Sequence, residues 1–251
     1  MTFFFCPILI MALASLRTRL DLYGGPASLF FSAPTTAVWK SLLQHPELLR
    51  YTLNSLLVAF ATTGISLALG TLAVYGLARG RLPILEQVSF LILCIRMLPP
   101  VVMALPLFVL MKKADLLDTR LAVITAHTAF NLPFVIWMMR EFIRALPIEL
   151  EEAGMIDGLT RMQAFRRILL PLLWPSLMAV GIFCVAFSLS EFLLAFILTQ
   201  NTAKTLPVFI GAMDWHRASA AGTAFLLPVL GFGLFVQKHL TRALSFGAVA
   251  S

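Results

Sequence analysis

Charged residues are scarce in this chain of 251 residues, at 12%, whereas apolar residues make up 60%. A soluble domain has roughly 25% charged and 45–50% apolar residues, so this composition excludes an ordinary soluble protein. The basic residues, which give a net charge of +7, lie between apolar blocks rather than together on one polar face. They therefore indicate charges that flank membrane segments, and nucleic acid is not expected as a partner.

Residues that build metal, disulfide and nucleotide sites are also few. The three cysteines, Cys6, Cys94 and Cys184, are far apart, and each lies within an apolar run. We interpret them as small hydrophobic packing residues. The pattern G-x-x-x-x-G-K-[ST] does not occur in the sequence, so the chain does not bind a nucleotide through a Walker A loop. We expect no metal and no cofactor on this chain.

Long uncharged runs are what the sequence has instead. They cover 51–78, 121–139, 168–190 and 218–237. A helix needs about 20 apolar residues to cross a bilayer, so each of these runs is long enough to form a membrane span.

With two weaker candidates, the sequence predicts an all-α membrane protein of about six transmembrane helices, in which residues 1–251 form a single transmembrane domain. The predicted spans are 3–16, 51–78, 85–111, 121–140, 172–199 and 218–238. The first is short, because about 14 residues that rise 1.5 Å each reach only about 21 Å. No basic residue precedes it, so we expect a short or truncated span rather than a signal peptide.

One face of the second predicted span carries only small residues, at the spacing of a helix. They are Ala59, Thr63, Ser66, Gly70 and Ala73. Small residues let helix backbones approach closely in a membrane, so this face predicts a packing seam. Several other spans contain prolines, which fit a moving pathway better than a static anchor.

Four polar residues within the predicted spans are candidates for a translocation pathway: Arg96, His127, Asn131 and Glu191. A charged or polar group in a membrane is costly unless it faces a partner or a water-filled cavity. His127 and Glu191 lie at similar depths, about 9 and about 12 Å from the outer ends of their spans, so they allow a pair or a polar wall. The alternatives stay open that His127 is a packing residue and that Glu191 is a structural cap.

The segment 147–171 has the clearest local signals. Pro147 and the acidic residues after it suit the start of a helix, and Asp157-Gly158 suits its end. Thr160 and Gln163 have the spacing of a capping box that starts a second helix, and Pro171 marks the return toward the membrane. The segment therefore predicts two short helices with a glycine corner. Such a surface suits docking into a partner, and an amphipathic loop on lipid headgroups is the alternative.

This segment also carries a resemblance to a known family. Glu152-Ala153-Gly154, then Asp157-Gly158 and, after nine residues, Ile168-x-Leu170-Pro171 resemble the EAA motif of ABC-importer permeases. The family usually has alanine at the third position, where this chain has Gly154. Further fragments are similar to the carbohydrate-uptake branch with maltose-type second permeases: Asn54-Ser55, Leu98-Pro99-Pro100, Glu191-Phe192 and Thr205-Leu206-Pro207.

The resemblance implies a helical permease of the importer type (MetI-like) in a bacterial cytoplasmic (inner) membrane. The loop 147–171 would be its cytoplasmic coupling-helix loop, which also sets the orientation, because the basic residues divide evenly between the two sides. The residues implied in docking to an ATPase are Glu152, Ala153, Gly154, Asp157, Gly158, Phe165, Ile168 and Pro171.

The same resemblance implies the partners. They are a second permease subunit in a heterodimer, two cytoplasmic ATPase subunits that bind ATP and Mg, and an extracytoplasmic solute-binding protein. The chain itself would not be an enzyme, and the solute would be a sugar, a polyol or a related hydroxylated compound.

Two other functions remain in competition at this point. An ion-gradient-driven secondary transporter or channel would use His127 and Glu191 as a proton relay, and it would work without any ATPase. An intramembrane hydrolase would need a paired nucleophile and base. Ser188 and Ser190 lie near Glu191 in the sequence, but no G-x-S-x-G motif is present, so we rank this function last.

Overall fold

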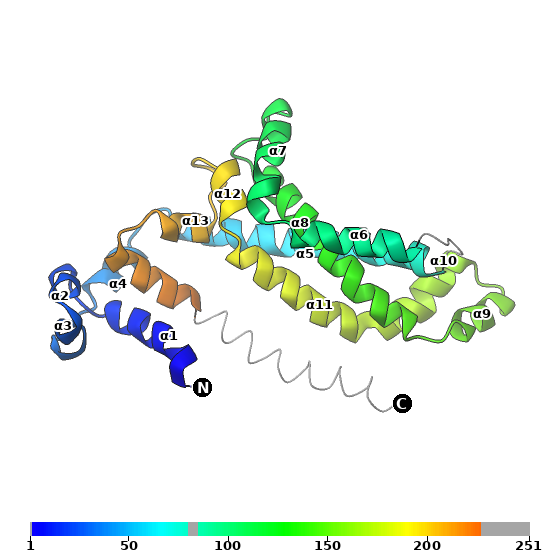
Figure 1. The fold of residues 1–251 in the computed structure, drawn as a ribbon, viewed down its shortest axis with the longest axis horizontal. Coiled ribbons are helices and arrows are strands. Elements are labelled where there is room, and N and C mark those ends of the chain that lie inside the picture. The colour runs from blue at the N-terminus through cyan, green and yellow to red at the C-terminus, as the bar shows by residue number, and fades with distance from the viewer. Residues whose placement is uncertain (1, 80–84, 227–251) are drawn as a thin grey trace.

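The structure, a computed structural model, describes residues 2–79 and 85–226, and every regular element within these ranges is a helix. The molecule is elongated, and its longest helices run along its long axis (Figure 1). This confirms the prediction of an all-α chain.

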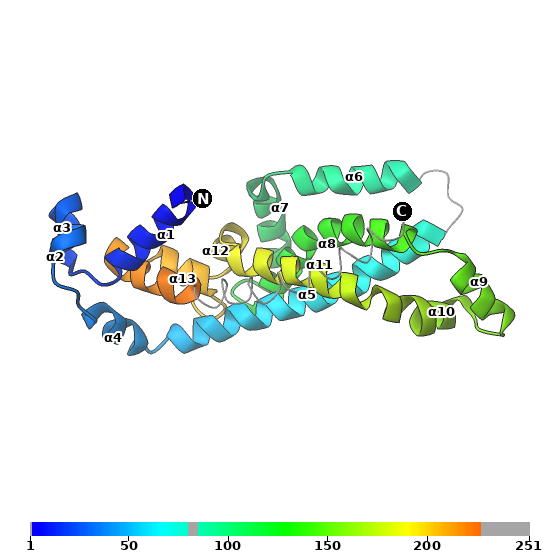
Figure 2. The ribbon, with the colours of Figure 1, turned by 90° about the horizontal axis from the view of Figure 1, so that it is seen from below.

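Three long helices form the centre of the molecule: α5 (Leu48–Arg79), α8 (Arg120–Arg144) and α11 (Leu170–Ser190). They pack against one another along their lengths (Figure 2). Among the described residues, α5, α8 and the continuous helical stretch Arg161–Ser190 are the single helices that are long and apolar enough to cross a membrane.

The close packing of α5 follows from the small residues on one of its faces. Four of the five predicted positions are buried: Ala59, Thr63, Ser66 and Gly70. The fifth, Ala73, is exposed. A Cβ atom at Gly70 would lie 2.6 Å from Val135 Cγ1 on α8, so the two helices can approach this closely only where α5 has no side chain.

The predicted span 85–111 is not one straight helix. Two helices, α6 (Leu85–Met97) and α7 (Pro100–Lys113), cover it, and the chain bends by 93° between them, so the pair is a broken span or a re-entrant loop. Pro99 and Pro100 cause this break, because proline lacks the N–H group that continues a helix and disfavours the helical conformation of the residue before it. As a result, α7 projects from the side of the bundle (Figure 1).

The prediction of one helix over 172–199 is also wrong. The helix α11 ends at Ser190, Glu191 has an extended backbone with ψ of 124°, and α12 (Leu193–Leu198) follows. The Glu191 carboxylate accepts hydrogen bonds from the N–H groups of Leu194, at 2.9 Å, and Ala195, at 3.2 Å. It thereby caps the start of α12, which makes the break a stable feature.

Five short helices gather toward one end of the molecule (Figure 1). They are α1 (Thr2–Ala14), α2 (Arg19–Tyr23), α3 (Pro26–Phe31), α4 (Ala37–Leu43) and α13 (Leu206–Gly211). With 13 residues, α1 is too short to cross a bilayer by itself. Residues 215–226 are helical, and the rest of the predicted span 218–238 lies outside the described residues. The described part contains three candidate spans, or four with the bent pair, so the predicted number of six stays a prediction.

Candidate functional site

The loop 147–171 forms a corner at the end of the molecule opposite these short helices (Figure 1). The helix α9 (Glu149–Ile156) ends where the sequence predicts, and Gly158 follows with φ of 87°. The N–H of Leu159 returns to the carbonyl of Gly154 at 3.0 Å, which closes the end of α9. Nothing lies within 4 Å of a Cβ built on Gly158, so its backbone conformation, rather than lack of space, requires glycine.

The predicted capping box starts the next helix. The Gln163 side chain accepts from the Thr160 N–H at 2.8 Å, and the Thr160 hydroxyl accepts from the Gln163 N–H at 3.4 Å. This second helix, α10 (Arg161–Ala164), does not end before the membrane segment, however. A π-helical turn η1 (Phe165–Leu169) and α11 follow it without a break, so residues Arg161–Ser190 are helical throughout.

Pro171 does not interrupt this helix, because the π-helical turn before it changes the hydrogen-bond register. The N–H of Leu170 bonds to the carbonyl of Phe165, five residues earlier. Pro171 follows directly, so its missing N–H group falls beside this change of register.

The predicted docking residues divide into an exposed and a buried group. Glu152, Ala153, Asp157, Gly158 and Pro171 are exposed, and Ile168 is half-buried. Gly154 and Phe165 are buried, and both pack within this chain. The side chain of Ile168 packs on α9 at Gly154, where an added Cβ atom would be too close to Ile168 Cδ1. The ring of Phe165 packs against that of Tyr75 on α5, with centroids 4.5 Å apart.

The surface available to a partner therefore consists of the exposed group together with Ile156, which is 86% exposed. An apolar side chain this accessible beside charged neighbours is typical of a docking surface. That an ATPase occupies it stays a prediction.

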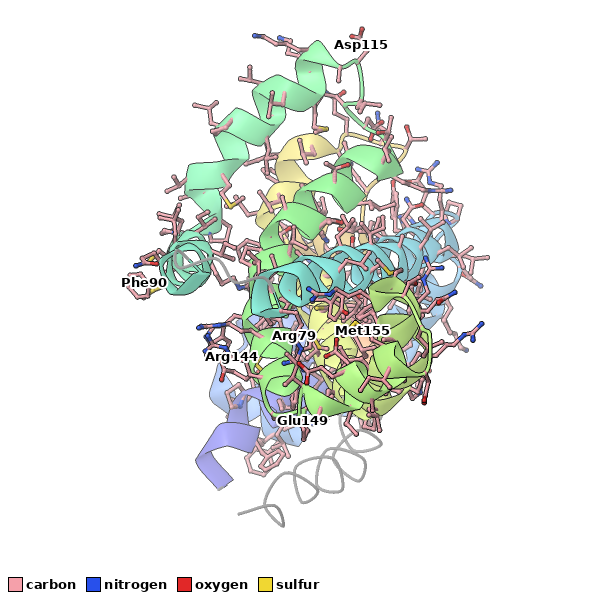
Figure 3. The ribbon with its side chains drawn as sticks, turned by 90° about the vertical axis from the view of Figure 1, so that its right-hand side faces the viewer. Arg79, Phe90, Asp115, Arg144, Glu149 and Met155 are labelled. Carbon is pink, nitrogen blue, oxygen red and sulfur yellow. The ribbon has the colours of Figure 1, made fainter. Side chains whose placement is uncertain are left out.

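A buried polar cluster that the sequence interpretation missed lies beneath the corner. Glu151 Oε1 is 2.7 Å from Arg79 Nε at the end of α5, and the Tyr75 hydroxyl donates to Glu151 Oε2 at 2.9 Å. Figure 3 looks onto this end of the molecule, with Arg79 among the helices and Glu149 and Met155 on α9. The one signal in the sequence was the position of Arg79 directly after the uncharged run 51–78.

The four predicted pathway residues lie around the contact between α8 and α11. His127 Nε2 is 3.2 Å from Glu191 Oε2, and His127 Nδ1 is 2.7 Å from the Ser188 hydroxyl. Asn131 donates to the carbonyl of Cys184 at 3.3 Å. The pair that the sequence allowed is therefore present, and Ser188 bonds the other ring nitrogen of His127.

Arg96 of α6 lies against the same region. Its guanidinium donates to the carbonyl of Phe130 at 2.9 Å and stacks over the rings of Phe130 and Phe187, at 3.9 and 4.8 Å from their centroids. The aromatic faces and the carbonyl offset the cost of a charge at this depth. Arg96 is partly exposed, whereas the side chain of Glu191 is 8% exposed and His127 and Asn131 are buried.

The side chains around His127, which are those of Asn131, Ser188 and Glu191, are nearly closed to solvent. His127 and Asn131 are 2% and 1% exposed, and Ser188 is 6% exposed. In the described chain these side chains bond helix to helix, and the serine and histidine that a hydrolase would need are closed to a substrate. The carboxylate of Glu191 caps α12 at the same time, so the group fastens α8 to the break between α11 and α12.

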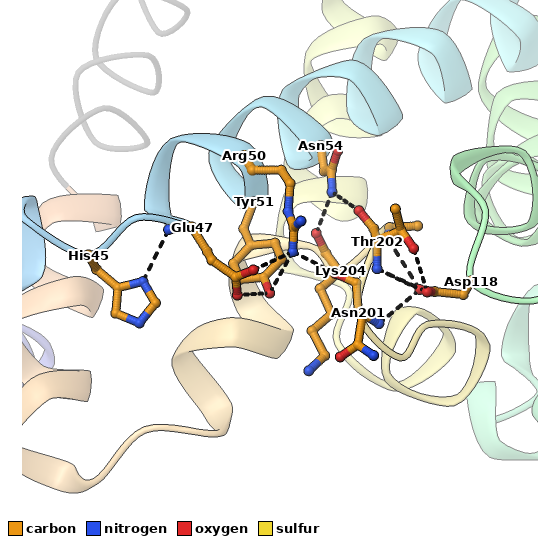
Figure 4. A network of polar contacts seen from close by, with 10 residues as sticks. His45, Glu47, Arg50, Tyr51, Asn54, Asp118, Asn201, Thr202 and Lys204 are labelled. Carbon is orange, nitrogen blue, oxygen red and sulfur yellow. Dashed lines mark hydrogen bonds and ion pairs between the residues drawn. The ribbon is translucent and has the colours of Figure 1, made fainter.

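The other ends of the long helices are held by a second polar network, shown in Figure 4. Asp118 lies between α7 and α8, and its carboxylate accepts hydrogen bonds from the loop after α12. The donors are the backbone N–H groups of Gln200, Asn201, Thr202 and Ala203 and the hydroxyl of Thr202. Partial burial alone would raise the pKa of Asp118, but the hydrogen bonds from Thr202 and the neighbouring N–H groups outweigh it and hold the pKa of this carboxyl below its usual range.

Two fragments of the sequence that are far apart meet in the same place. Asn54 donates to the carbonyls of Thr202 and Lys204, at 3.0 and 2.9 Å, and the N–H of Leu206 donates to the Ser55 hydroxyl at 2.7 Å. The fragments Asn54-Ser55 and Thr205-Leu206-Pro207 thus form one contact between α5 and the start of α13.

Several apolar helices long enough to cross a bilayer indicate a multispan membrane protein. The family described as binding-protein-dependent transport system inner membrane component matches residues 67–246. The match covers more than half of the chain, and the chain belongs to this family of transport permeases.

Relatives and solved structures agree with this family. The chain is 32% identical over 250 residues to the sulfoquinovosyl glycerol transport system permease protein SmoH of Agrobacterium fabrum, covering 97% of this chain and 88% of the relative. It is 33% identical over 206 residues to the trehalose transport system permease protein SugB of Mycobacterium tuberculosis, covering 78% and 75%. A chain of a bacterial ABC transporter involved in the import of alginate has the same fold, with a TM-score of 0.76, 20% identity and coverage of 94% and 92%. The MetI-like permease fold is thereby confirmed.

Proposed function

We propose that this chain is the transmembrane subunit of an ATP-driven importer for a sugar, a polyol or a related hydroxylated solute, and that it forms half of the translocation pathway. The observation that carries this proposal is the capped corner at 147–171, which combines the EAA-like residues with an exposed surface. The relatives named for sulfoquinovosyl glycerol and trehalose support the class of solute.

ATP and Mg are bound and consumed on two separate ATPase subunits in this proposal. The exposed residues Glu152, Ala153 and Asp157, with Ile156 between them, dock into the ATPase at the cytoplasmic side of a bacterial inner membrane. Closure of the ATPase pair moves the corner, and the continuous helix Arg161–Ser190 carries this movement into the membrane. Two discrete arrangements of the helices then alternate, which is how rigid elements couple distant sites.

A second, similar permease completes the pathway, and a solute-binding protein docks at the end that carries the Asp118 network. His127 and Asn131 are buried within this chain, so in the arrangement described here they shape the pathway indirectly. Arg96 is the pathway residue of this chain that is best placed to reach a hydroxylated solute, because its guanidinium stays partly exposed.

The proposal is tested by purifying the chain in mild detergent from its native membranes and identifying the proteins that accompany it by mass spectrometry. We expect a second permease and an ATPase in comparable amounts. A stable assembly of this polypeptide alone that transports solute in liposomes would contradict the proposal, and it would favour the ion-driven transporter.

A further inference from the structure

The end of α5 beneath the corner carries three polar residues that act together. We call Tyr75, Arg79 and Glu151 the α5 anchor. The side chains of Arg79 and Glu151 are 11% and 5% exposed, and their ion pair has an N–O distance of 2.7 Å. A pair this deeply buried keeps its geometry, because either charge without the other is strongly unfavourable.

The α5 anchor contacts every segment that meets at the corner. The Arg79 guanidinium also donates to the carbonyls of Leu146, at 3.1 Å, and Ile143, at 3.4 Å, where α8 ends. The Tyr75 hydroxyl lies 2.9 Å from Glu151 Oε2 on α9 and 3.1 Å from the carbonyl of Arg161 on α10. The hydroxyl has one proton and donates to one of these acceptors at a time. It therefore lies between α9 and α10, the two helices that meet at the corner.

Without these contacts α9 would be poorly held. It has eight residues, which is too few for a helix to be stable by itself. The chain attaches it to α8 on one side and to the Gly158 corner on the other, and its buried face rests mainly on Gly154 under Ile168. Among the contacts of the described residues, the ion pair of Glu151 with Arg79 joins α9 to a long membrane helix.

We propose that Glu151 is a positioning residue: held by Arg79 and Tyr75, it fixes the coupling helix α9 on α5, so that α5 moves with the ATPase-docking surface. This inference rests on the proposed function for the identity of the docking partner. It adds a second route for the movement, through a side-chain contact to α5, beside the continuous helix into α11.

The other carboxylates of α9 distinguish the positioning role of Glu151 from a direct role in docking. Glu152 is exposed and belongs to the predicted docking surface, whereas Glu151 is turned inward and cannot reach a partner. Glu149 lies on the same helix, is exposed, and is neither in the α5 anchor nor among the docking residues. The change Glu149→Gln is therefore a matched control for Glu151→Gln.

The test measures the distance between α9 and α5 in the purified complex of the chain with its partners. Spin labels at Leu150 on α9 and Leu72 on α5, both exposed and outside the docking surface, report it by pulsed electron paramagnetic resonance. We expect one narrow distance distribution in the otherwise unchanged chain, the same with and without Mg-ATP. Glu151→Gln and Arg79→Gln should at least double the width of the distribution and make it respond to Mg-ATP, and Glu149→Gln should not.

Tyr75→Phe is the second variant in case the charge changes prevent folding. It removes the hydroxyl but keeps the ring that packs on Phe165, so it should broaden the distribution to a smaller extent. An unchanged distribution in Glu151→Gln and Tyr75→Phe, or a large Mg-ATP-induced shift in the parent complex, would overturn the inference even though the ATPase is present. If no ATPase accompanies the parent chain, the proposed function fails instead, and the widths without nucleotide still decide whether the α5 anchor holds α9.

Discussion

At the scale of single residues, two glycines on tightly packed surfaces behave differently because of what faces them. Gly70 faces Val135, whose Cγ1 would lie 2.6 Å and whose Cβ would lie 3.1 Å from an added Cβ atom. Gly154 faces the terminal Cδ1 of Ile168, which can turn away. A β-branched valine has one strongly preferred rotamer, so it cannot make room in the same way.

We therefore predict that Gly70→Ala destabilises the protein by about 1–3 kcal/mol through overpacking. Gly154→Ala should change stability by less than about 1 kcal/mol, because alanine favours the helix by nearly as much as the adjustment of Ile168 costs. Thermal unfolding in detergent, followed by tryptophan fluorescence, compares the two variants. Equal losses of stability in the two variants would contradict the prediction that Val135 leaves less room at Gly70 than Ile168 leaves at Gly154.

Local residue patterns predicted the corner well and its surroundings poorly. Gly158 and the Thr160 capping box are encoded within a few residues, so the sequence reveals them directly. The partner of Glu151 lies 72 residues away, and only the packing of α9 on α5 brings it near. The π-helical turn before Pro171 has no such local signal, and two of its residues, Phe165 and Leu169, are buried in the folded chain.

At the scale of elements, Asp118 holds the loop after α12 through a carboxylate surrounded by N–H groups. Its pKa is lower in the folded protein than the ordinary value of 3.8. The stabilisation from this carboxylate is therefore fully present at pH values above about 3.8, the ordinary pKa. It is lost as the pH falls through the lower pKa of the folded protein. At neutral pH the carboxylate is charged in the folded and the unfolded chain alike.

We predict that the protection of the backbone amides at 200–203 against hydrogen exchange stays constant from neutral pH down to about 4 and falls only in stronger acid. At neutral pH, Asp118→Asn should lower this protection about tenfold or more, because charge-assisted hydrogen bonds are replaced by weaker ones. Asp115→Asn is the matched control, since Asp115 lies in the same loop, is exposed and has a similar positive φ. A similar loss in both variants would contradict the role of Asp118.

Elements were predictable in number and type where the uncharged runs are long, as in α5 and α8. The direction of the chain within the broken elements was not predictable, because hydropathy depends on residue type alone. Residues 85–111 are apolar throughout most of their length, yet the chain turns by 93° within them. The Glu191 break was likewise hidden, since a single carboxylate can cap a new helix or pair across helices, and here it does both.

At the scale of the whole molecule, the two polar networks lie at opposite ends of the long helices. The α5 anchor and the corner lie at one end, and Asp118, Asn54 and the loop after α12 lie at the other (Figures 1 and 4). In a membrane these ends face opposite sides, because α5 has 32 residues, more than a bilayer requires.

We predict that the corner faces the cytoplasm and the loop after α12 faces the exterior. In a chain whose three cysteines are replaced, Asn201→Cys should react with a membrane-impermeant maleimide on spheroplasts, and Glu149→Cys should react only after the membrane is permeabilised. Both positions are exposed and lie outside the docking surface, so access to the reagent depends on the side of the membrane. Labelling of Glu149→Cys from outside would overturn the assignment of the corner to an ATPase.

The length of α11 has a mechanical consequence. With 21 residues it is about 31 Å long, so a tilt of about 5° around one end displaces the other by about 3 Å. A small rotation where α11 leaves the corner is thus magnified at its far end, next to the junction with α12, without any backbone hydrogen bond of α11 having to break.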